Sequence, residues 1–167
     1  IYIVSWIVFI GLCIEAGALL FNFILTLFKP IAANNIYKGL NLSALYGTNF
    51  AQYFGVMSFV VVLSLMKAYL FYLVVKIFIK LNLVKPFNVE IAKLIEKISF
   101  EAFNIAIVSV IAYQYTKRLI QSGYVLGDVG QYWDDTTAFL MMAAIIFVIS
   151  QIFKKGIEIQ NEIDLTV

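Results

Sequence analysis

The stretch FAQYFGVMSFVVVLSLMKAYLFYLVVKIFI, residues 50–79, decides the fold of this chain. It contains only two charged side chains, Lys67 and Lys76, and no proline. As a helix it would extend ~45 Å, which exceeds the ~30 Å hydrocarbon core of a bilayer. The stretch is therefore predicted to be a transmembrane helix, and its length leaves its depth in the membrane open.

Three further apolar blocks surround this stretch. The first ends at Lys29 and Pro30, where charge and a proline stop a helix together. It has no basic region before it and no cleavage motif after it, so we expect a retained span and not a signal peptide. Because the chain opens at Ile1, we also expect natural sequence before it. Residues 1–167 are predicted to form one all-α membrane domain, a four-transmembrane-helix bundle with spans at about residues 1–28, 50–79, 98–118 and 136–153 and a cytoplasmic tail at residues 154–167.

A short amphipathic helix is predicted before the third span. Asn88 stands at an N-cap position, and apolar and charged side chains alternate with helical spacing after it. This segment is expected to lie at the membrane interface and to run into the third span. At the start of the fourth span, Asp134, Asp135 and Thr136 are expected to cap the helix.

The composition excludes several classes of protein. Hydrophobic residues make up 63% and charged residues 13% of the chain, against about 45–50% and 25% in soluble domains, and the mean hydropathy is +0.94. The absence of histidine excludes His-ligated haem, His-containing zinc sites and a Ser-His-Asp triad. The single cysteine, Cys13, excludes an intramolecular disulfide and a C-x-x-C pair. We therefore predict no catalytic residue, no metal site and no cofactor, and expect a protein that is not an enzyme.

The distribution of basic residues predicts the orientation. One side of the four predicted spans carries Lys76, Lys80, Lys85, Lys93, Lys97, Lys154 and Lys155. The other side carries Lys29, Lys38, Lys117 and Arg118. The excess predicts that both termini are cytoplasmic. The net charge of +2 is too small to suggest binding to nucleic acid.

Several motifs resemble a known family. They are Asn41-Leu-Ser-Ala-Leu, Lys67-Ala-Tyr-Leu-Phe-Tyr-Leu, Lys85-Pro-Phe, and the tail Gln151-Ile-Phe-Lys-Lys-Gly-Ile-Glu-Ile-Gln followed by Asp164-Leu-Thr-Val. Together they resemble the bacterial integral membrane family called domain of unknown function 2975. The resemblance implies four helices in a bacterial cell (inner) membrane, and it brings no activity, substrate or catalytic residue.

Two charged residues are predicted inside the membrane. Glu15 falls in the middle of the first span and Lys67 in the second, where a charge costs about 2.5–3.5 kcal/mol. Their depths differ by ~6 Å, within reach of a long lysine side chain, so we predict an intramembrane Glu15–Lys67 pair. Asn22 and Ser64 are expected to support it from the same helix faces.

Three interpretations of these charges stay open. The pair can be a static salt bridge that fixes helix packing, or the floor of a cavity that binds a ligand, ion or proton and switches state. In the third, the second helix sits lower, Lys67 reaches the cytoplasmic headgroups, and Glu15 is protonated or faces water.

The tail has two structural alternatives. Its apolar residues alternate with period two from Ile157, which fits a strand, and also recur at Ile159, Ile163 and Val167, which fits an extension of the fourth helix. In either form it is expected to pack under the protein's own cytoplasmic face or to dock a protein partner or second copy. We predict a non-enzymatic sensor or accessory subunit. The alternative is a small transporter or channel-like permease, against which the end positions of Pro30 and Pro86 argue.

Overall fold

A computed structural model of the chain describes residues 2–81 and 88–166, with side chains up to residue 162. Within these residues the structure is helical and contains no strand. The long helices are α1 (Tyr2–Phe28), α3 (Phe50–Lys80), α4 (Val89–Gln121) and α5 (Thr136–Thr166). Short helices connect them: η1 (Pro30–Asn34), η2 (Tyr37–Gly39) and α2 (Ser43–Thr48) between α1 and α3, and η3 (Val129–Tyr132) before α5.

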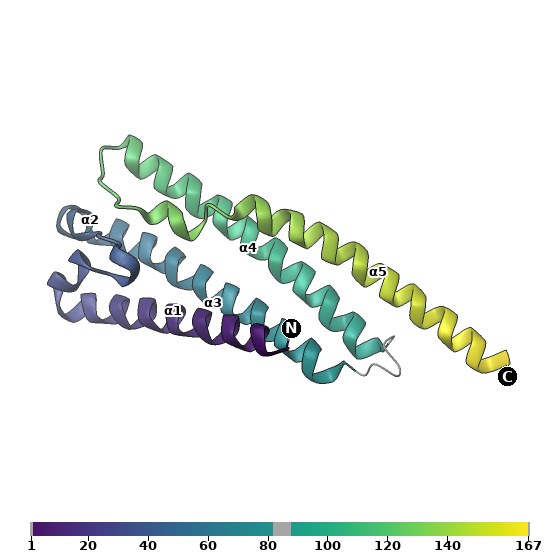
Figure 1. Cartoon of the computed structure of the whole chain (residues 1–167). Helices are drawn as coiled ribbons and strands as arrows, with labels where there is room; N and C mark the ends of the chain where they lie inside the picture. Colours follow the sequence, from purple (N-terminus) through teal and green to yellow (C-terminus); the bar gives the residue numbers. More distant parts are fainter. Residues whose placement is uncertain (1, 82–87, 167) are drawn as a thin grey trace.

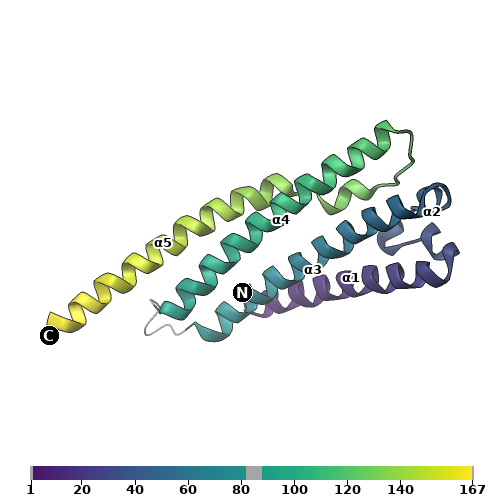
Figure 2. The same ribbon diagram turned by 180° about the vertical axis from the view of Figure 1, so that it is seen from behind.

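The long helices pack in the order in which they occur in the chain. The helix α3 lies against α1 on one side and α4 on the other, and α4 lies against α5 (Figures 1 and 2). Consistent with this central place, α3 contributes much of the buried core, including Tyr53, Val56, Met57, Val60 and Leu63. The helices α1 and α5 expose most of their apolar side chains on the outside of the row.

Helix boundaries agree with the sequence signals in several places. The helix α1 ends at Phe28, directly before Lys29 and Pro30. Asn88 caps α4 as predicted, because its side-chain oxygen accepts a hydrogen bond from the Glu90 amide at 2.7 Å. From there α4 runs without interruption, so the segment predicted to be amphipathic and the predicted third span form one helix.

Among the described residues, three helical segments are long and apolar enough to cross a membrane: Tyr2–Phe28, Phe50–Lys80 and Val129–Glu162. The helix α4 is not among them, since Glu101, Asn104 and Gln114 make it more polar. Its position between α3 and α5 gives a physical reason, because a helix shielded on two sides can carry more polar residues.

The two connections at one end of the molecule form a compact unit, which we call the loop cap (residues 29–49 and 122–135). A Cβ atom placed on Gly127 would lie only 2.6 Å from the carbonyl oxygen of Asn41, so the two connections touch. Apolar side chains of both are buried beneath it: Ala33, Ile36, Leu40, Leu42, Leu45, Leu126, Val129 and Trp133. The first connection is therefore folded and has a buried apolar core, although its sequence is more polar than that of the helices.

The tail continues the last helix. The helix α5 reaches Thr166, so the helical alternative describes the tail and the strand alternative does not. The C-terminal end of α5 extends well beyond the neighbouring end of α4 (Figures 1 and 2). Where the two helices still overlap, Lys154 forms an ion pair with Glu96 at 2.7 Å.

Candidate functional site

Glu15 lies in the middle of α1 and takes its partner from the loop cap. The Lys38 ammonium donates a hydrogen bond to Glu15 Oε2 at 2.7 Å. The backbone of Lys38 has a φ of 58°, in the left-handed region that non-glycine residues seldom adopt. The hydrogen bond to Glu15 raises the pKa of Lys38 above its ordinary value, although desolvation opposes the shift.

Lys67 lies in the middle of α3 and is bound by the start of α5. Its ammonium lies 3.1 Å from Asp135 Oδ2 and donates a hydrogen bond to the Tyr132 carbonyl oxygen at 3.0 Å. It also lies 5.4 Å from the centre of the Phe139 ring. The Lys67 side chain is 17% exposed and that of Asp135 47%, so this pair reaches from the interior to the surface.

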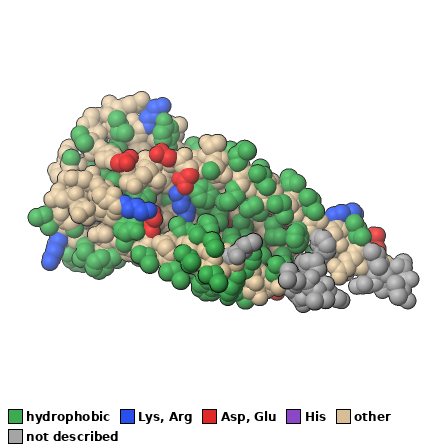
Figure 3. All heavy atoms as spheres, viewed as in Figure 1, with side chains coloured by type: hydrophobic (Ala, Val, Ile, Leu, Met, Phe, Trp, Pro, Cys, Tyr) green, Lys and Arg blue, Asp and Glu red, His purple; other side chains and the backbone are tan. Residues whose placement is uncertain are grey.

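Tyr132 lies between the two ion pairs. Its hydroxyl donates a hydrogen bond to the carbonyl oxygen of Tyr37, the neighbour of Lys38, at 3.3 Å, while its own carbonyl binds Lys67. We call Glu15, Lys38, Lys67, Tyr132 and Asp135 the ion-pair cluster. It joins α1, η2, α3, η3 and the start of α5. Charged side chains of both signs gather in one group on this face (Figure 3).

The predicted direct pair between Glu15 and Lys67 is replaced by these two pairs. The reason is the loop cap, which folds back over the helices and brings Lys38 and Asp135 to the depth of the intrahelical charges. Asn22 and Ser64 do not join the cluster, because each donates a hydrogen bond to a carbonyl of its own helix.

The sequence interpretation missed three members of the cluster, Lys38, Tyr132 and Asp135. From the sequence, Lys38 is predicted to be a topology signal and Asp135 a helix cap. The Asp135 carbonyl does accept the first hydrogen bond of α5, from Phe139, but its carboxylate binds Lys67. Two unbalanced charges inside the predicted spans were the available signal, since each needs a partner and the connections supply them.

Neutral hydrogen bonds hold neighbouring helices together elsewhere. The Tyr53 hydroxyl of α3 donates to the buried Thr26 hydroxyl of α1 at 2.7 Å. Tyr115 of α4 hydrogen-bonds Gln52 of α3, and Ser99 of α4 donates to the Ala143 carbonyl of α5 at 2.9 Å. These contacts hold neighbouring helices of the row together, and the ion-pair cluster adds charged contacts of α1 and α3 with the loop cap.

The chemistry open to the cluster is electrostatic. Among the described residues, no three histidine, cysteine or acidic side chains are placed to hold a metal ion. Lysine and carboxylate partners can separate when a competing ion, a proton or a change of local hydration favours the open form. The cluster thus provides charged contacts between separate helices and their connections.

These features define a class, the helical proteins with several segments apolar enough to cross a membrane. A family model described as "Protein of unknown function (DUF2975)" matches residues 49–167, and the chain belongs to this family. The match includes α3, α4 and α5, with Lys67, Tyr132 and Asp135, and excludes Glu15 and Lys38. No curated protein and no solved structure matches the chain.

Proposed function

We propose that the chain is a non-enzymatic sensor or accessory subunit of a bacterial cell membrane, with α4 as a fourth span and both termini in the cytoplasm. The start of α1 and the end of α5 lie toward the same end of the helix row, opposite the loop cap (Figure 1). This arrangement supports a topology with both termini on one side. The excess of lysine near these ends supports a cytoplasmic placement.

The observation that carries the proposal is the ion pair between Lys67 and Asp135. Asp135 directly precedes α5, and α5 is one uninterrupted helix from Thr136 to Thr166. A helix transmits a displacement at one end to the other, because its hydrogen bonds make it stiff over many turns. Opening of the Lys67–Asp135 pair would therefore be reported at the cytoplasmic tail.

The energy of the pair suits a switch. Lys67 is mostly buried and has both a carboxylate and a carbonyl oxygen within 3.2 Å, which stabilises the closed form. Asp135 is about half exposed, so the protein does not enclose its carboxylate, and a cation that binds it would stabilise the open form. Two states that differ by a few kcal/mol can be shifted by a ligand with unequal affinity for them.

The tail would deliver the signal to a protein partner or a second copy. It extends past the end of α4 and presents Ile159, which is 48% exposed, beside charged residues. An amphipathic helix end of this kind can dock in a groove of another protein. Removal of residues 160–167 is expected to abolish the downstream response without loss of membrane insertion.

The coupling can be tested by distance measurements in the full chain reconstituted into vesicles. In a Cys13→Ser background, spin labels at Ile79 of α3 and Ile152 of α5 are attached to exposed positions of both helices. We expect Lys67→Met and Asp135→Asn to shift or broaden the distance distribution between the labels. Lys76→Met is the matched control on the same helix, because Lys76 forms no ion pair among the described residues and its ammonium lies 6.0 Å from the centre of the Tyr72 ring.

Superimposable distributions for the original chain, Lys67→Met and Asp135→Asn would overturn the proposal. A solute or ion flux in the same vesicles that Glu15→Gln abolishes would establish the transporter alternative in its place.

A further inference from the structure

A row of neighbouring cavities, which we call the groove, follows the seam between α4 and α5. Four cavities of about 220 to 370 Å³ lie along it and share lining residues from one to the next. We number the cavities from the loop cap. The first and second share Trp133 and Asp134, the second and third share Val110 and Thr136, and the third and fourth share Leu140. The groove therefore extends from the loop cap toward the middle of the helices.

The end of the groove at the loop cap carries two opposite charges. Lys117 and Asp134 line the same cavity of about 370 Å³, together with Tyr113 and Trp133. Among the described residues, neither Lys117 nor Asp134 forms an ion pair, and the Lys117 ammonium lies 5.9 Å from the centre of the Tyr113 ring. Aromatic and basic side chains of this kind are typical of the headgroup level of a membrane.

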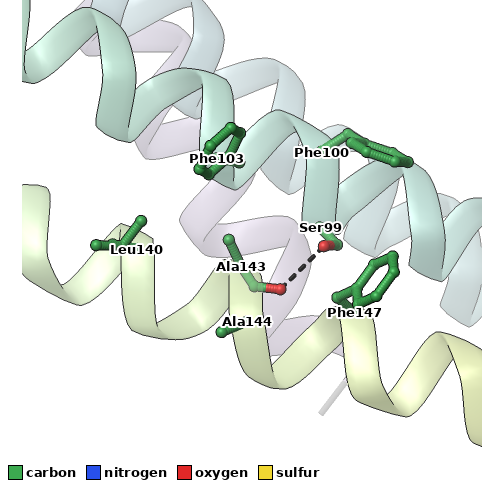
Figure 4. Close-up of a pocket in the computed structure, with 7 residues that line it drawn as sticks. All are labelled: Ser99, Phe100, Phe103, Leu140, Ala143, Ala144 and Phe147. Atoms are coloured by element: carbon green, nitrogen blue, oxygen red, sulfur yellow. Dashed lines mark hydrogen bonds between the residues drawn. The ribbon is translucent and has the colours of Figure 1, made fainter.

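The rest of the groove is apolar. The third cavity, of about 230 Å³, is lined by Ala106, Ile107, Val110, Ile111, Thr136 and Leu140. Beyond it, Figure 4 shows the small side chains of Ala143 and Ala144 on α5 between the larger side chains of Leu140 and Phe147. The only hydrogen bond drawn there joins Ser99 to the Ala143 carbonyl, so both groups are already satisfied.

The part of the groove from the charged cavity to the third cavity has the length of one leaflet. From Lys117 to Ala106 the helix α4 rises ~16 Å at 1.5 Å per residue. Half of the ~30 Å hydrocarbon core of a bilayer is ~15 Å. A headgroup at Lys117 would therefore place its acyl chain along the third cavity and end it near the bilayer centre.

We propose that this groove binds one phospholipid with an amine-bearing zwitterionic headgroup, of the phosphatidylethanolamine type, from the leaflet opposite the chain termini. The phosphate would bind the Lys117 ammonium and the primary amine the Asp134 carboxylate. An anionic headgroup without an amine leaves Asp134 unpaired and repelled, and a choline headgroup has no N–H to donate to it. The charge pattern thus selects the amine-bearing headgroup from the lipids that the apolar part accepts.

The binding can be measured by quenching of Trp133, which lines the charged cavity. The only other tryptophan is Trp6 on α1, so the Trp6→Phe chain reports on the groove alone. This full chain is purified in detergent micelles and titrated with phosphatidylethanolamine, phosphatidylglycerol or phosphatidylcholine brominated on one acyl chain. We expect half-maximal quenching by phosphatidylethanolamine at the lowest lipid fraction of the three.

Variants of both ends then test the assigned contacts. Lys117→Gln and Asp134→Asn are each expected to weaken phosphatidylethanolamine binding about tenfold, as for the loss of one charge-assisted hydrogen bond. Arg118→Gln and Asp128→Asn are the matched controls, since neither residue lines the groove. Val110→Phe should fill the apolar part and weaken binding of all three lipids.

Two results would overturn the proposal: equal quenching by the three lipids, or phosphatidylethanolamine binding that is unchanged in Lys117→Gln and Asp134→Asn. Either result would mean that the groove is covered by surrounding lipid without selection of a headgroup. Quenching that is lost when the chain self-associates would assign the groove to a second copy and would overturn it as well. In the complementary Trp133→Phe chain, quenching of Trp6 should not respond to Lys117→Gln. These outcomes do not depend on the ion-pair cluster.

Discussion

The Lys67 ammonium of α3 lies 3.1 Å from the carboxylate of Asp135, which is 68 residues later in the chain and directly precedes α5. This contact spans the row of helices, because α3 and α5 are separated by α4 for most of their length. The loop cap makes it possible by returning the chain from the end of α4 to the middle of α3. The stability of the cap and the position of α5 are therefore coupled through one ion pair.

Lys67→Met and Asp135→Asn should each destabilise the protein, and their effects should not add. We expect a coupling energy of about 1 kcal/mol in a double-mutant cycle, at the upper end for exposed pairs since only Lys67 is mostly buried. The free energy of unfolding in detergent, followed by denaturant titration, provides the measurement. The matched cycle of Lys76→Met with Asp135→Asn should be additive. A coupling energy indistinguishable from zero for Lys67 and Asp135 would contradict the observed contact.

Charge reversal can distinguish Lys38, the partner of Glu15 in the structure, from Lys67, the partner that the sequence predicts. Glu15→Lys places two ammonium groups together at Lys38 and should lower the midpoint of thermal unfolding. Adding Lys38→Glu restores opposite charges and should recover most of the loss, whereas adding Lys67→Glu should not. Rescue by Lys67→Glu alone would support the direct Glu15–Lys67 pair and would count against the contact with Lys38.

Gly127→Ala should destabilise the loop cap. The added Cβ would lie 2.6 Å from the Asn41 carbonyl oxygen, a backbone atom that can move only with its whole loop. Overpacking of this kind costs about 1–3 kcal/mol. Gly47→Ala is the matched control in the other connection, because nothing lies within 4 Å of its new Cβ and it lies in the helix α2. Equal stability of the two variants would show that the two connections do not touch.

Thr26→Val tests the buried contact between α1 and α3. The substitution keeps the shape of the side chain but removes the hydroxyl that accepts a hydrogen bond from Tyr53. An unsatisfied buried hydroxyl costs about 1–3 kcal/mol, so unfolding should become easier by that amount. Thr26→Ser should keep the bond, and Tyr53→Phe in the Thr26→Val background should recover part of the loss. A Thr26→Val chain as stable as the original would exclude a stabilising role for the bond.

The sequence predicted the long helices better than their connections. Long apolar blocks ended by charge, proline or an N-cap determine helices locally, and α1, α3 and the start of α4 agree with those signals. The fourth long helix continues past Phe153 because polar residues after it still favour a helix, and hydropathy alone does not show where a helix ends. The loop cap depends on contacts between residues far apart in sequence, such as Gly127 with Asn41, which no local pattern contains.

The candidate site was predicted only in part. Hydropathy singled out Glu15 and Lys67, because a charge in an apolar block has a cost that is independent of the rest of the fold. Hydropathy could not predict the partners of these two residues. Lys38 and Asp135 lie in polar connections, where a charge has no desolvation cost and so gives no signal in the sequence. Only the folded loop cap places these charges beside a helix.

The start of α4 should depend on pH through Glu90. Its hydrogen bond and ion pair with Lys80 at the end of α3 hold the pKa of Glu90 below its ordinary value of 4.5. A lowered pKa in the folded state means that the contact stabilises the protein above pH 4.5, where the carboxylate is charged in both states. The stabilisation is lost as the pH falls below 4.5 and through the folded-state pKa.

Hydrogen exchange at the Ala92 amide, which donates to the Asn88 carbonyl oxygen, measures opening of this first turn after correction for the intrinsic rate. We expect its protection to decrease from pH 6 to pH 3 in the original chain and to be low at both values in Glu90→Gln. Glu158→Gln, which removes the ion pair with Lys155 in α5, is the matched control and should leave Ala92 unaffected. If protection at Ala92 were the same at both pH values in the original chain, the pair would not hold the ends of α3 and α4 together.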